Sequence, residues 1–462
     1  MFSRISIILV LMFSLNSFAS WDAAQKNYKD RNKLSLIIKE LVEGGYYFAA
    51  LPMVKEYLGR KSGKLSNSMD RTLAKIINKV GVKQFETLPF RYLEKSRSQV
   101  VRYILAKKYM RKKRYSSALK ELNRITTTHS VYPFASNMKA VIYSLAKEND
   151  QSISEFRKCE QSSLRALQRD KNNRRLQLNR DYCVLGVART KFASREHIDA
   201  DLLYLDIPKS SMIWPEILFE EAWNSYYKRD YNRTLGKLVS YKAPVFAHMF
   251  NPEIDVLSAL SYLKLCLYPD AKKISNDFYK KYLKDARSLR TYLKRYRKNL
   301  GYYHDLITQY KKNKRAPNEL MKTLLSSISK EEVFRDLKKE LVGVSREFEK
   351  ARNQSNTRFK RFVLQNIQES ISSQKKIIGG HVRGKLLSHY VKLYKAFEGM
   401  SYIKLEVLAQ RKAKLYSFDE TARERGDIKF IQRNDKQYFW DFNGEFWADE
   451  LGDYVFALRS EC

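Results

Sequence analysis

The same small and apolar residues recur at a fixed offset in two neighbouring stretches of this chain. Residues 102–125 read RYILAKKYMRKKRYSSALKELNRI, and residues 139–159 read KAVIYSLAKENDQSISEFRKC. Five pairs of positions are each 34 residues apart: Ala106/Ala140, Tyr109/Tyr143, Ala118/Ser152, Leu122/Phe156 and Ile125/Cys159. A constant offset of this length is typical of repeat proteins, in which similar units stack along the chain.

The spacing within each copy is helical. The small residues Ala106 and Ala118 let two antiparallel helices approach closely, and Tyr109, Leu122 and Ile125 fill the seam between them. A polar turn, KKRYS, lies between the two small residues. One such helix pair cannot bury its apolar face alone, so the sequence predicts that copies stack into a superhelix.

This pattern resembles the tetratricopeptide (TPR) repeat, a helix–turn–helix unit of about 34 residues with small residues near its eighth and twentieth positions. Tyr115 stands where the repeat has its second aromatic residue. Looser copies lie at residues 33–58, 216–241 and 253–282, and a degenerate one at 182–207. The resemblance implies an all-α, right-handed TPR-like solenoid over residues 20–285, with about six to eight repeats. A generic helical bundle is the alternative.

Residues 1–19 have the pattern of a signal peptide. Arg4 precedes the apolar run Ile5–Leu15, and Ser17 and Ala19 provide small residues at the −3 and −1 positions of a cleavage site. An uncleaved anchor is the alternative, but the apolar run has only about half the length that spans a bilayer. We therefore expect secretion across the inner membrane, with the periplasm of a Gram-negative bacterium as the location. No later stretch is long and apolar enough to predict a transmembrane span in the mature chain.

The charge balance is strongly basic, with 88 Lys and Arg against 50 Asp and Glu, a formal net charge of +38. Such a chain attracts polyanions, among them nucleic acid, lipopolysaccharide, anionic cell-wall polymers and acidic proteins. Secretion makes nucleic acid a poor partner, so we expect an acidic protein or peptide. The candidate contacts are Arg102, Lys107, Arg111, Lys113, Arg114, Arg290, Lys294, Arg297 and Lys298. For the last four the alternative is a solvated helix face.

Residues 286–416 are predicted to form basic helices and a long helical hairpin. Leu337, Leu341, Val344 and Phe348 share one helical face. Gly379-Gly380 is expected to end the first long helix, and a second helix is expected from about His381 to Tyr416.

Residues 417–462 change in character, to an aromatic and acidic C-terminal cap. Asn443-Gly444 between aromatic segments predicts a short β-hairpin, and Tyr454-Val455-Phe456 a further strand. One interpretation is a small β-rich cap docked on the basic helical hairpin; the other is a partner-binding surface anchored by Trp440 and Trp447.

The cap sequence resembles tails that follow TPR arrays in envelope proteins of gliding or predatory bacteria, which implies an envelope or motility-complex role. The residues of the resemblance are Tyr438, Trp440, Phe442, Gly444, Glu445, Phe446, Trp447, Asp449, Glu450, Leu451 and Gly452.

Motifs for catalysis are missing from the sequence. The six His residues form no H-E-x-x-H motif, and neither G-x-S-x-G nor G-x-G-x-x-G occurs. We therefore predict no catalytic residues, no cofactor and no metal site. A cell-wall enzyme or its activator stays as an alternative, with Glu445 as its candidate acid. Another alternative is a general binder of polyanions or lipopolysaccharide.

The four Cys residues allow disulfides in an oxidising compartment. Cys159 and Cys183 lie about a dozen residues on either side of the turn DKNN at 170–173, which places them at one level of an antiparallel helix pair. They form either a disulfide or two small core thiols at repeat positions where Ala is usual. The other pairing would be Cys266 with Cys462.

Overall fold

A computed structural model describes residues 20–413 and 428–462 of the chain. The chain is 73% helical, and the strands of its described part are β1 (Trp440–Asp441) and β2 (Tyr454–Val455), so the all-α, solenoid-like fold class is confirmed. The expected signal peptide at 1–19 lies outside the described residues, as does the expected boundary between the hairpin and the cap, within 414–427.

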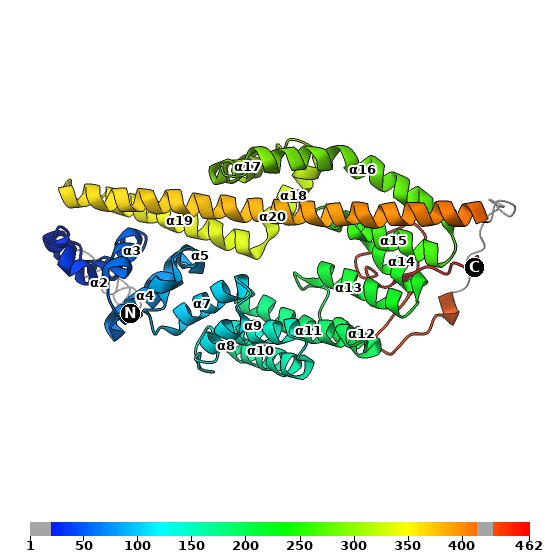
Figure 1. Cartoon of the computed structure of the whole chain (residues 1–462), viewed down its shortest axis with the longest axis horizontal. Coiled ribbons are helices and arrows are strands. Elements are labelled where there is room, and N and C mark those ends of the chain that lie inside the picture. Colours follow the sequence, from blue (N-terminus) through cyan, green and yellow to red (C-terminus); the bar gives the residue numbers. More distant parts are fainter. Residues whose placement is uncertain (1–19, 414–427) are drawn as a thin grey trace, which may run out of the picture. The chain divides into compact units, whose positions relative to one another are not determined.

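The described residues divide into two compact units, each built from segments that are distant in sequence. Unit 1 contains residues 20–142, 300–304 and 331–381, and unit 2 contains residues 143–299, 305–330, 382–413 and 428–462. Three helices contribute residues to both units: α9 (Tyr132–Leu145), α17 (Leu300–Asn313) and α20 (Arg358–Ala413) (Figure 1).

The other elements follow the chain within their units. Those of unit 1 are η1 (Arg31–Lys33), α2 (Leu34–Glu43), α3 (Ala50–Arg60), α4 (Asn67–Val80), α5 (Val82–Glu86), α6 (Phe90–Leu93), α7 (Gln99–Arg111), α8 (Tyr115–Leu122) and α19 (Glu332–Arg352). Those of unit 2, besides the strands, are α10 (Asn149–Arg169), α11 (Arg174–Ala193), α12 (His197–Leu205), α13 (Trp214–Tyr227), α14 (Tyr231–Val239), η2 (Ser240–Lys242), η3 (Pro244–Phe246), α15 (Glu253–Lys264), α16 (Tyr268–Arg295), α18 (Glu319–Lys330) and η4 (Ile428–Phe430).

Most of the seam positions expected from the repeat are buried, and the aromatic positions Tyr109 and Tyr143 are half-buried. Ala106, Ala118 and Leu122 are inaccessible to solvent and Ile125 nearly so, because α7 and α8 pack face to face. In the second copy Ala140, Ser152, Phe156 and Cys159 are buried as well. Within unit 2 each helix from α10 to α16 packs on the next one along the chain, which is the nearest-neighbour packing of a solenoid.

One type of turn joins five of the helix pairs. In each, a residue other than glycine has a positive φ, and the amide of the following residue donates to the carbonyl five positions earlier, which closes the helix end. The left-handed residues are Lys113, Lys147, Arg195, Arg229 and Cys266. Lys113 and Lys147 are separated by the same offset as Ala106 and Ala140, and so are Arg195 and Arg229. The turn geometry therefore repeats with the period of the sequence pattern.

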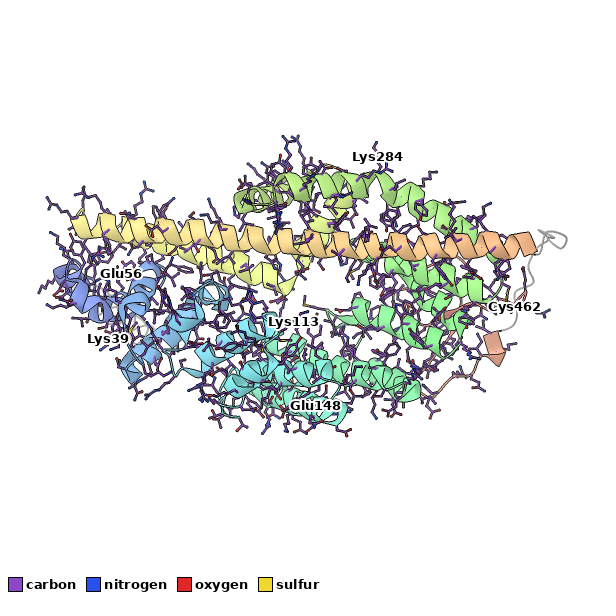
Figure 2. All side chains as sticks on the ribbon, viewed as in Figure 1. Lys39, Glu56, Lys113, Glu148, Lys284 and Cys462 are labelled. Carbon is purple, nitrogen blue, oxygen red and sulfur yellow. A yellow bond between two sulfur atoms is a disulfide. The ribbon has the colours of Figure 1, made fainter. Side chains whose placement is uncertain are left out.

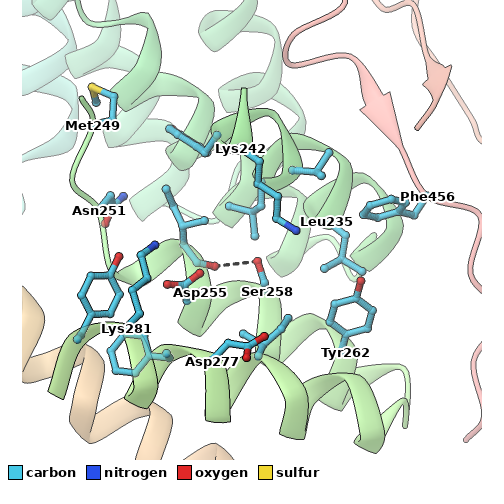
Figure 3. Close-up of a pocket in the computed structure, with 17 residues that line it drawn as sticks. Leu235, Lys242, Met249, Asn251, Asp255, Ser258, Tyr262, Asp277, Lys281 and Phe456 are labelled. Atoms are coloured by element: carbon cyan, nitrogen blue, oxygen red, sulfur yellow. Dashed lines mark hydrogen bonds between the residues drawn. The ribbon is translucent and has the colours of Figure 1, made fainter. Parts of the chain in front are cut away.

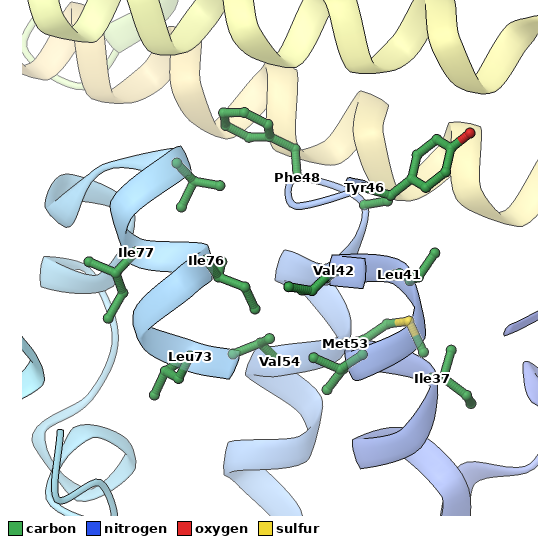
Figure 4. Packing of buried hydrophobic residues seen from close by; sticks show 14 of the residues in the cluster. Ile37, Leu41, Val42, Tyr46, Phe48, Met53, Val54, Leu73, Ile76 and Ile77 are labelled. Atoms are coloured by element: carbon green, nitrogen blue, oxygen red, sulfur yellow. The ribbon is translucent and has the colours of Figure 1, made fainter. Parts of the chain in front are cut away.

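The core of unit 1 forms where α2, α3 and α4 pack together, and Figure 4 shows Val42, Val54 and Ile76 facing one another there. The helices α19 and α20 pack on this core through Val344 and Val363. Glu347 of α19 accepts hydrogen bonds from the amides of Phe48, at 3.0 Å, and Ala49, at 2.7 Å, at the start of α3. A buried carboxylate therefore satisfies the amides that a helix start leaves without partners.

The predicted helix end at Gly379-Gly380 is wrong. Helix α20 runs without interruption from Arg358 to Ala413, and the turn of the hairpin lies at 353–357, between α19 and α20. A Cβ atom at Gly379 would collide with the carbonyl oxygen of Leu300. The glycine therefore permits close approach of α17 and does not break the helix. The expected shared face of α19 is confirmed, since Leu337 and Val344 are buried and Leu341 and Phe348 pack against the core.

The predicted β-hairpin at Asn443-Gly444 is also wrong. Strands β1 and β2 pair in parallel, with Trp440 opposite Tyr454, and the residues between them form the connection. The described contacts of the cap include those with α13 and α14, whereas one interpretation expected the long helical hairpin. Gly236 of α14 allows this, because a Cβ there would overlap the backbone of Tyr454. The Asn232 side chain holds the segment after Tyr454 against α14 through two hydrogen bonds with the backbone of Leu458.

Candidate partner-binding surface

Three of the five predicted contact residues at 102–114 form ion pairs with carboxylates of unit 1. The Arg102 guanidinium lies 3.1 Å from a carboxylate oxygen of Glu121 on α8. Lys107 and Arg111 both reach Glu86, the last residue of α5, at 2.6 Å and 3.1 Å. The structure therefore brings these predicted contacts together as internal ion pairs.

Glu86 is the centre of this basic cluster. Its side chain is only 3% exposed, and Lys83 adds a third cation at 3.2 Å. Burial by itself raises the pKa of Glu86, but the attraction of Lys107, Lys83 and Arg111 outweighs burial and holds the pKa below its ordinary value. The carboxylate stays charged at neutral pH and organises the cations around it. We call these four residues the Glu86 cluster.

Lys113 and Arg114 lie in the turn between α7 and α8 and are exposed (Figure 2). Their positions follow from the shared turn, in which Lys113 has the left-handed conformation and the Arg114 amide donates to the Tyr109 carbonyl at 2.9 Å. Two exposed cations in one turn make a small basic surface.

The second predicted group lies on a much larger exposed surface. Arg290 and Lys294 are on α16, Arg297 and Lys298 are in the turn that follows it, and all four are exposed. On α16 they continue a row of exposed cations at helical spacing, and side chains project from the helix around Lys284 in Figure 2. We define the α16 basic face as Lys273, Lys280, Lys284, Arg287, Arg290 and Lys294.

The cations of the α16 basic face make no ion pair with any residue in 20–413 or 428–462, in contrast to the Glu86 cluster. The face opposite them on α16 is buried, with Phe278, Ala286 and Leu289 in the core of unit 2. The helix therefore presents its charge in one direction because its apolar side is anchored.

Trp440 and Trp447 are exposed side chains of a cap in which Phe442, Phe446 and Phe456 are half-buried and Tyr454 is buried. The two Trp side chains are 47% and 58% exposed, whereas Phe442 and Tyr454 pack in the core of α13 and α14. Large exposed aromatic side chains are frequent anchors of protein interfaces. The candidate acid Glu445 lies on the same connection and is exposed.

Both Cys pairs form disulfides in the structure. Cys159 of α10 and Cys183 of α11 are bridged with a Cα–Cα separation of 6.0 Å, which is one of the two alternatives that the sequence left open. Cys266, in the turn before α16, is bridged to Cys462 with a Cα–Cα separation of 5.2 Å. The second bridge ties the end of the cap to the α15–α16 turn.

Unit 2 also contains a cavity of about 340 Å³ between α14, α15, α16 and Phe456 of the cap (Figure 3). Leu235 and Phe278 give it an apolar lining, and Asp255 and Lys281 add charge. Burial raises the pKa of Asp255, although Lys281 and Lys242 oppose this. The Ser258 hydroxyl donates to the Ile254 carbonyl at 2.8 Å, so it is held by its own helix.

A second cavity, of about 860 Å³, lies in unit 1 between α3, residues 84–92 and residues 369–373 of α20. Within 20–413 and 428–462, no group of three or more His, Cys, Asp or Glu side chains is arranged to hold a metal ion. No helix of the same residues has the length and apolarity that crossing a bilayer requires.

Comparisons with protein-family models and with curated proteins find no relative of this chain. The candidate surface is therefore defined by its own geometry, with the α16 basic face as its largest exposed feature.

Proposed function

We propose that this protein is a non-enzymatic, TPR-like scaffold that binds an acidic protein or peptide partner in a cell-envelope complex, in the periplasm of a Gram-negative bacterium. The observation that carries the proposal is the α16 basic face, a row of exposed cations without ion-pair partners on one long helix in the described part of the chain. The resemblance of the cap sequence to tails of envelope proteins points to a motility complex.

The regular turns support the TPR-like interpretation. Five helix pairs share one left-handed residue and one capping hydrogen bond, and two pairs of these turns keep the offset of the sequence repeat. Small residues such as Ala106 and Ala140 are buried at the seams, where the repeat requires them. Stacked repeats supply extended rigid surfaces, and such surfaces suit binding of an extended partner.

The disulfides support the proposed location. Disulfides persist in secreted and periplasmic proteins and are rare in the reducing cytosol. Two of them, Cys159–Cys183 and Cys266–Cys462, use all four Cys residues of the chain. Together with the signal-peptide pattern at 1–19, they favour export.

The linear arrangement of the cations favours an acidic polypeptide. Each exposed cation contributes about 1 kcal/mol or less to binding an acidic group, so affinity comes from the whole row and weakens as salt is added. A polypeptide with acidic side chains at intervals can follow such a row along the helix.

The test is binding of a fluorescently labelled polyglutamate peptide to the purified protein, measured by anisotropy. We compare the wild type with a variant that carries Arg290→Glu, Lys294→Glu, Arg297→Glu and Lys298→Glu. The matched control carries Arg165→Glu, Arg169→Glu, Lys171→Glu and Arg174→Glu at the exposed α10–α11 turn of the same unit. We expect the first variant to lose about tenfold or more in affinity and the control about twofold or less.

Other outcomes separate the alternatives. If both variants lose affinity equally, and lipopolysaccharide or heparin binds as well as the peptide, the protein is a general polyanion binder and the proposal fails. Activity on purified peptidoglycan that is lost in Glu445→Gln would identify a cell-wall enzyme and also contradict the proposal.

A further inference from the structure

The later part of α20, from Val382 onward, has apolar side chains on two opposite faces. One face is buried in unit 2, with Leu386, Leu393 and Met400 inaccessible to solvent. On the other, exposed face, Glu398 lies between Tyr394 and Tyr402, and the large apolar side chains are spaced by three, four and eight residues. These residues are Leu387 (41% exposed), Val391 (45%), Tyr394 (55%), Tyr402 (63%), Leu405 (67%) and Leu408 (49%). We call them the α20 apolar stripe.

An exposed apolar surface of this kind marks a docking site more often than a solvated face. The stripe from Leu387 to Leu408 extends over about 32 Å of helix, since each residue rises about 1.5 Å. Its spacing follows a helical period, so it matches the apolar side of one further helix.

Helix α16 packs beside this part of α20. The rings of Phe278 and Phe397 lie 4.9 Å apart, and the Tyr279 hydroxyl is 2.7 Å from the Ser401 hydroxyl. Further along α16, the Tyr282 ring lies 6.0 Å from the Phe250 ring, which lies 5.4 Å from the ring of His389, an earlier residue of α20. Residue numbers therefore run in opposite directions along the two helices, which are antiparallel (Figure 1).

The α16 basic face and the α20 apolar stripe lie on the same side of this helix pair. Successive residues of an α-helix point in directions about 100° apart. On α16, Phe278 is buried, the next residue, Tyr279, contacts α20, and the residue after that, Lys280, is exposed. On α20 buried Met400 is followed by Ser401, which contacts α16, and then by exposed Tyr402. Because the helices are antiparallel, the same order of rotation places Lys280 and Tyr402 on the same outward side.

We propose that the α20 apolar stripe and the α16 basic face together bind an amphipathic acidic helix of a partner protein. The apolar side of that helix packs on Tyr402, Leu405 and their neighbours, and its acidic flank lies against Lys280, Lys284 and Arg287. Charge complementarity identifies this occupant, because a second copy of this basic chain would bring like charges together. The inference rests on the proposed function and specifies the form of the acidic partner.

The test uses two labelled peptides of the same composition, each of about 21 residues, the length of the stripe at about 1.5 Å per residue. One has Leu at the a and d positions of a heptad and Glu at most others, and the other has these residues scrambled so that no apolar face forms. Binding to the purified protein is measured by anisotropy. We expect the amphipathic peptide to bind about tenfold or more tightly than the scrambled one.

Variants at exposed positions assign the binding to the two helices. The double variant Tyr402→Ser/Leu405→Ser is expected to bind the amphipathic peptide with about tenfold lower affinity and the scrambled peptide with unchanged affinity. The matched control is Leu145→Ser/Ile198→Ser, which replaces two exposed apolar residues of unit 2 that are 56% and 71% accessible. The double variant Lys280→Glu/Lys284→Glu is expected to weaken binding of both peptides. Circular dichroism confirms that each variant is folded.

The outcomes distinguish this inference from the proposed function. If both peptides bind equally, depend on Lys280 and Lys284, and ignore Tyr402→Ser/Leu405→Ser, the inference is wrong and the proposed function stands. If neither peptide binds, the proposed function fails as well. Self-association, or binding to anionic phospholipid vesicles, that the Tyr402→Ser/Leu405→Ser variant abolishes would assign the stripe to a second copy or to a membrane and overturn the inference.

Discussion

Two basic regions of this protein have a similar content of Lys and Arg but differ in what surrounds their cations. On α7, Lys107 and Arg111 surround the buried carboxylate of Glu86 and stabilise unit 1. On α16, Lys280, Lys284 and Arg287 point away from the core and have no ion-pair partner in the part of the chain that the structure describes. The density of Lys and Arg in the sequence is comparable, so charge alone does not identify a binding surface. The two regions differ in whether an acidic residue from another element lies close enough to form ion pairs with the cations.

The first prediction concerns the acidic residue itself. Glu86→Gln leaves Lys107, Lys83 and Arg111 close together without their counter-charge, and because these cations are 26%, 34% and 56% exposed, we expect the free energy of unfolding to fall by about 2 to 3 kcal/mol. Chemical denaturation measures the change. The matched control is Glu319→Gln, whose carboxylate is 84% exposed beside Lys322, and which should change stability by less than about 0.5 kcal/mol. A similar small change in Glu86→Gln would show that the Glu86 cluster is not a stabilising centre.

The second prediction compares Glu86 with Glu347, a buried carboxylate of the same unit. Burial raises the pKa of Glu347 to about 7, although the amides of Phe48 and Ala49 and the charge of Lys350 oppose it. A pKa that is raised in the folded state stabilises the fold below the ordinary value, and this stability is lost as the pH rises through the folded-state pKa. From about pH 4.5 to 7 the unfolding free energy should therefore decrease by about 3 kcal/mol on account of Glu347.

Glu347→Gln should remove this decrease, and Glu86→Gln should remove a pH dependence of opposite sign. The lowered pKa of Glu86 gives stability that is present above its ordinary value and is lost as the solution becomes more acidic. Denaturation curves across the pH range measure both effects. If the unfolding free energy of Glu347→Gln still decreases from about pH 4.5 to 7 as in the wild type, the decrease does not come from Glu347.

The third prediction replaces one lysine in each region by an apolar residue of similar length. Lys107→Met removes one of three cations from a buried carboxylate and should cost about 1 to 2 kcal/mol. Lys294→Met removes an exposed cation without an ion pair and should change stability by less than about 0.5 kcal/mol. Thermal unfolding of both variants under identical conditions makes the comparison. Equal losses would mean that the two regions do not differ as described.

Much of the helical architecture was predictable because it depends on local spacing. The buried seam residues Ala106, Ala118 and Ala140 follow from a constant offset that is visible in the sequence. The Cys159–Cys183 bridge was foreseeable as one of two alternatives, because both residues are at the same distance from one turn. These inferences need only helical periodicity and a turn.

Features that depend on contacts distant in the sequence were not predictable. Gly379 looks like a helix end, but its lack of a side chain serves the approach of Leu300, which belongs to another helix. Asn443-Gly444 has the residues of a hairpin turn, yet β1 pairs in parallel with β2 because the cap packs on α14. The ion pairs of Lys107 and Arg111 depend on Glu86, which belongs to another helix. The exposed α20 apolar stripe was missed because an apolar helix face reads as core, although its six residues keep a helical period of their own.

Hydrogen–deuterium exchange with and without an acidic amphipathic peptide tests the central claim most directly, because it locates the bound surface on the intact protein. The account predicts slower exchange in residues 268–298 and 387–408 and unchanged exchange in residues 99–114. Protection confined to 99–114, with α16 unaffected, would contradict it.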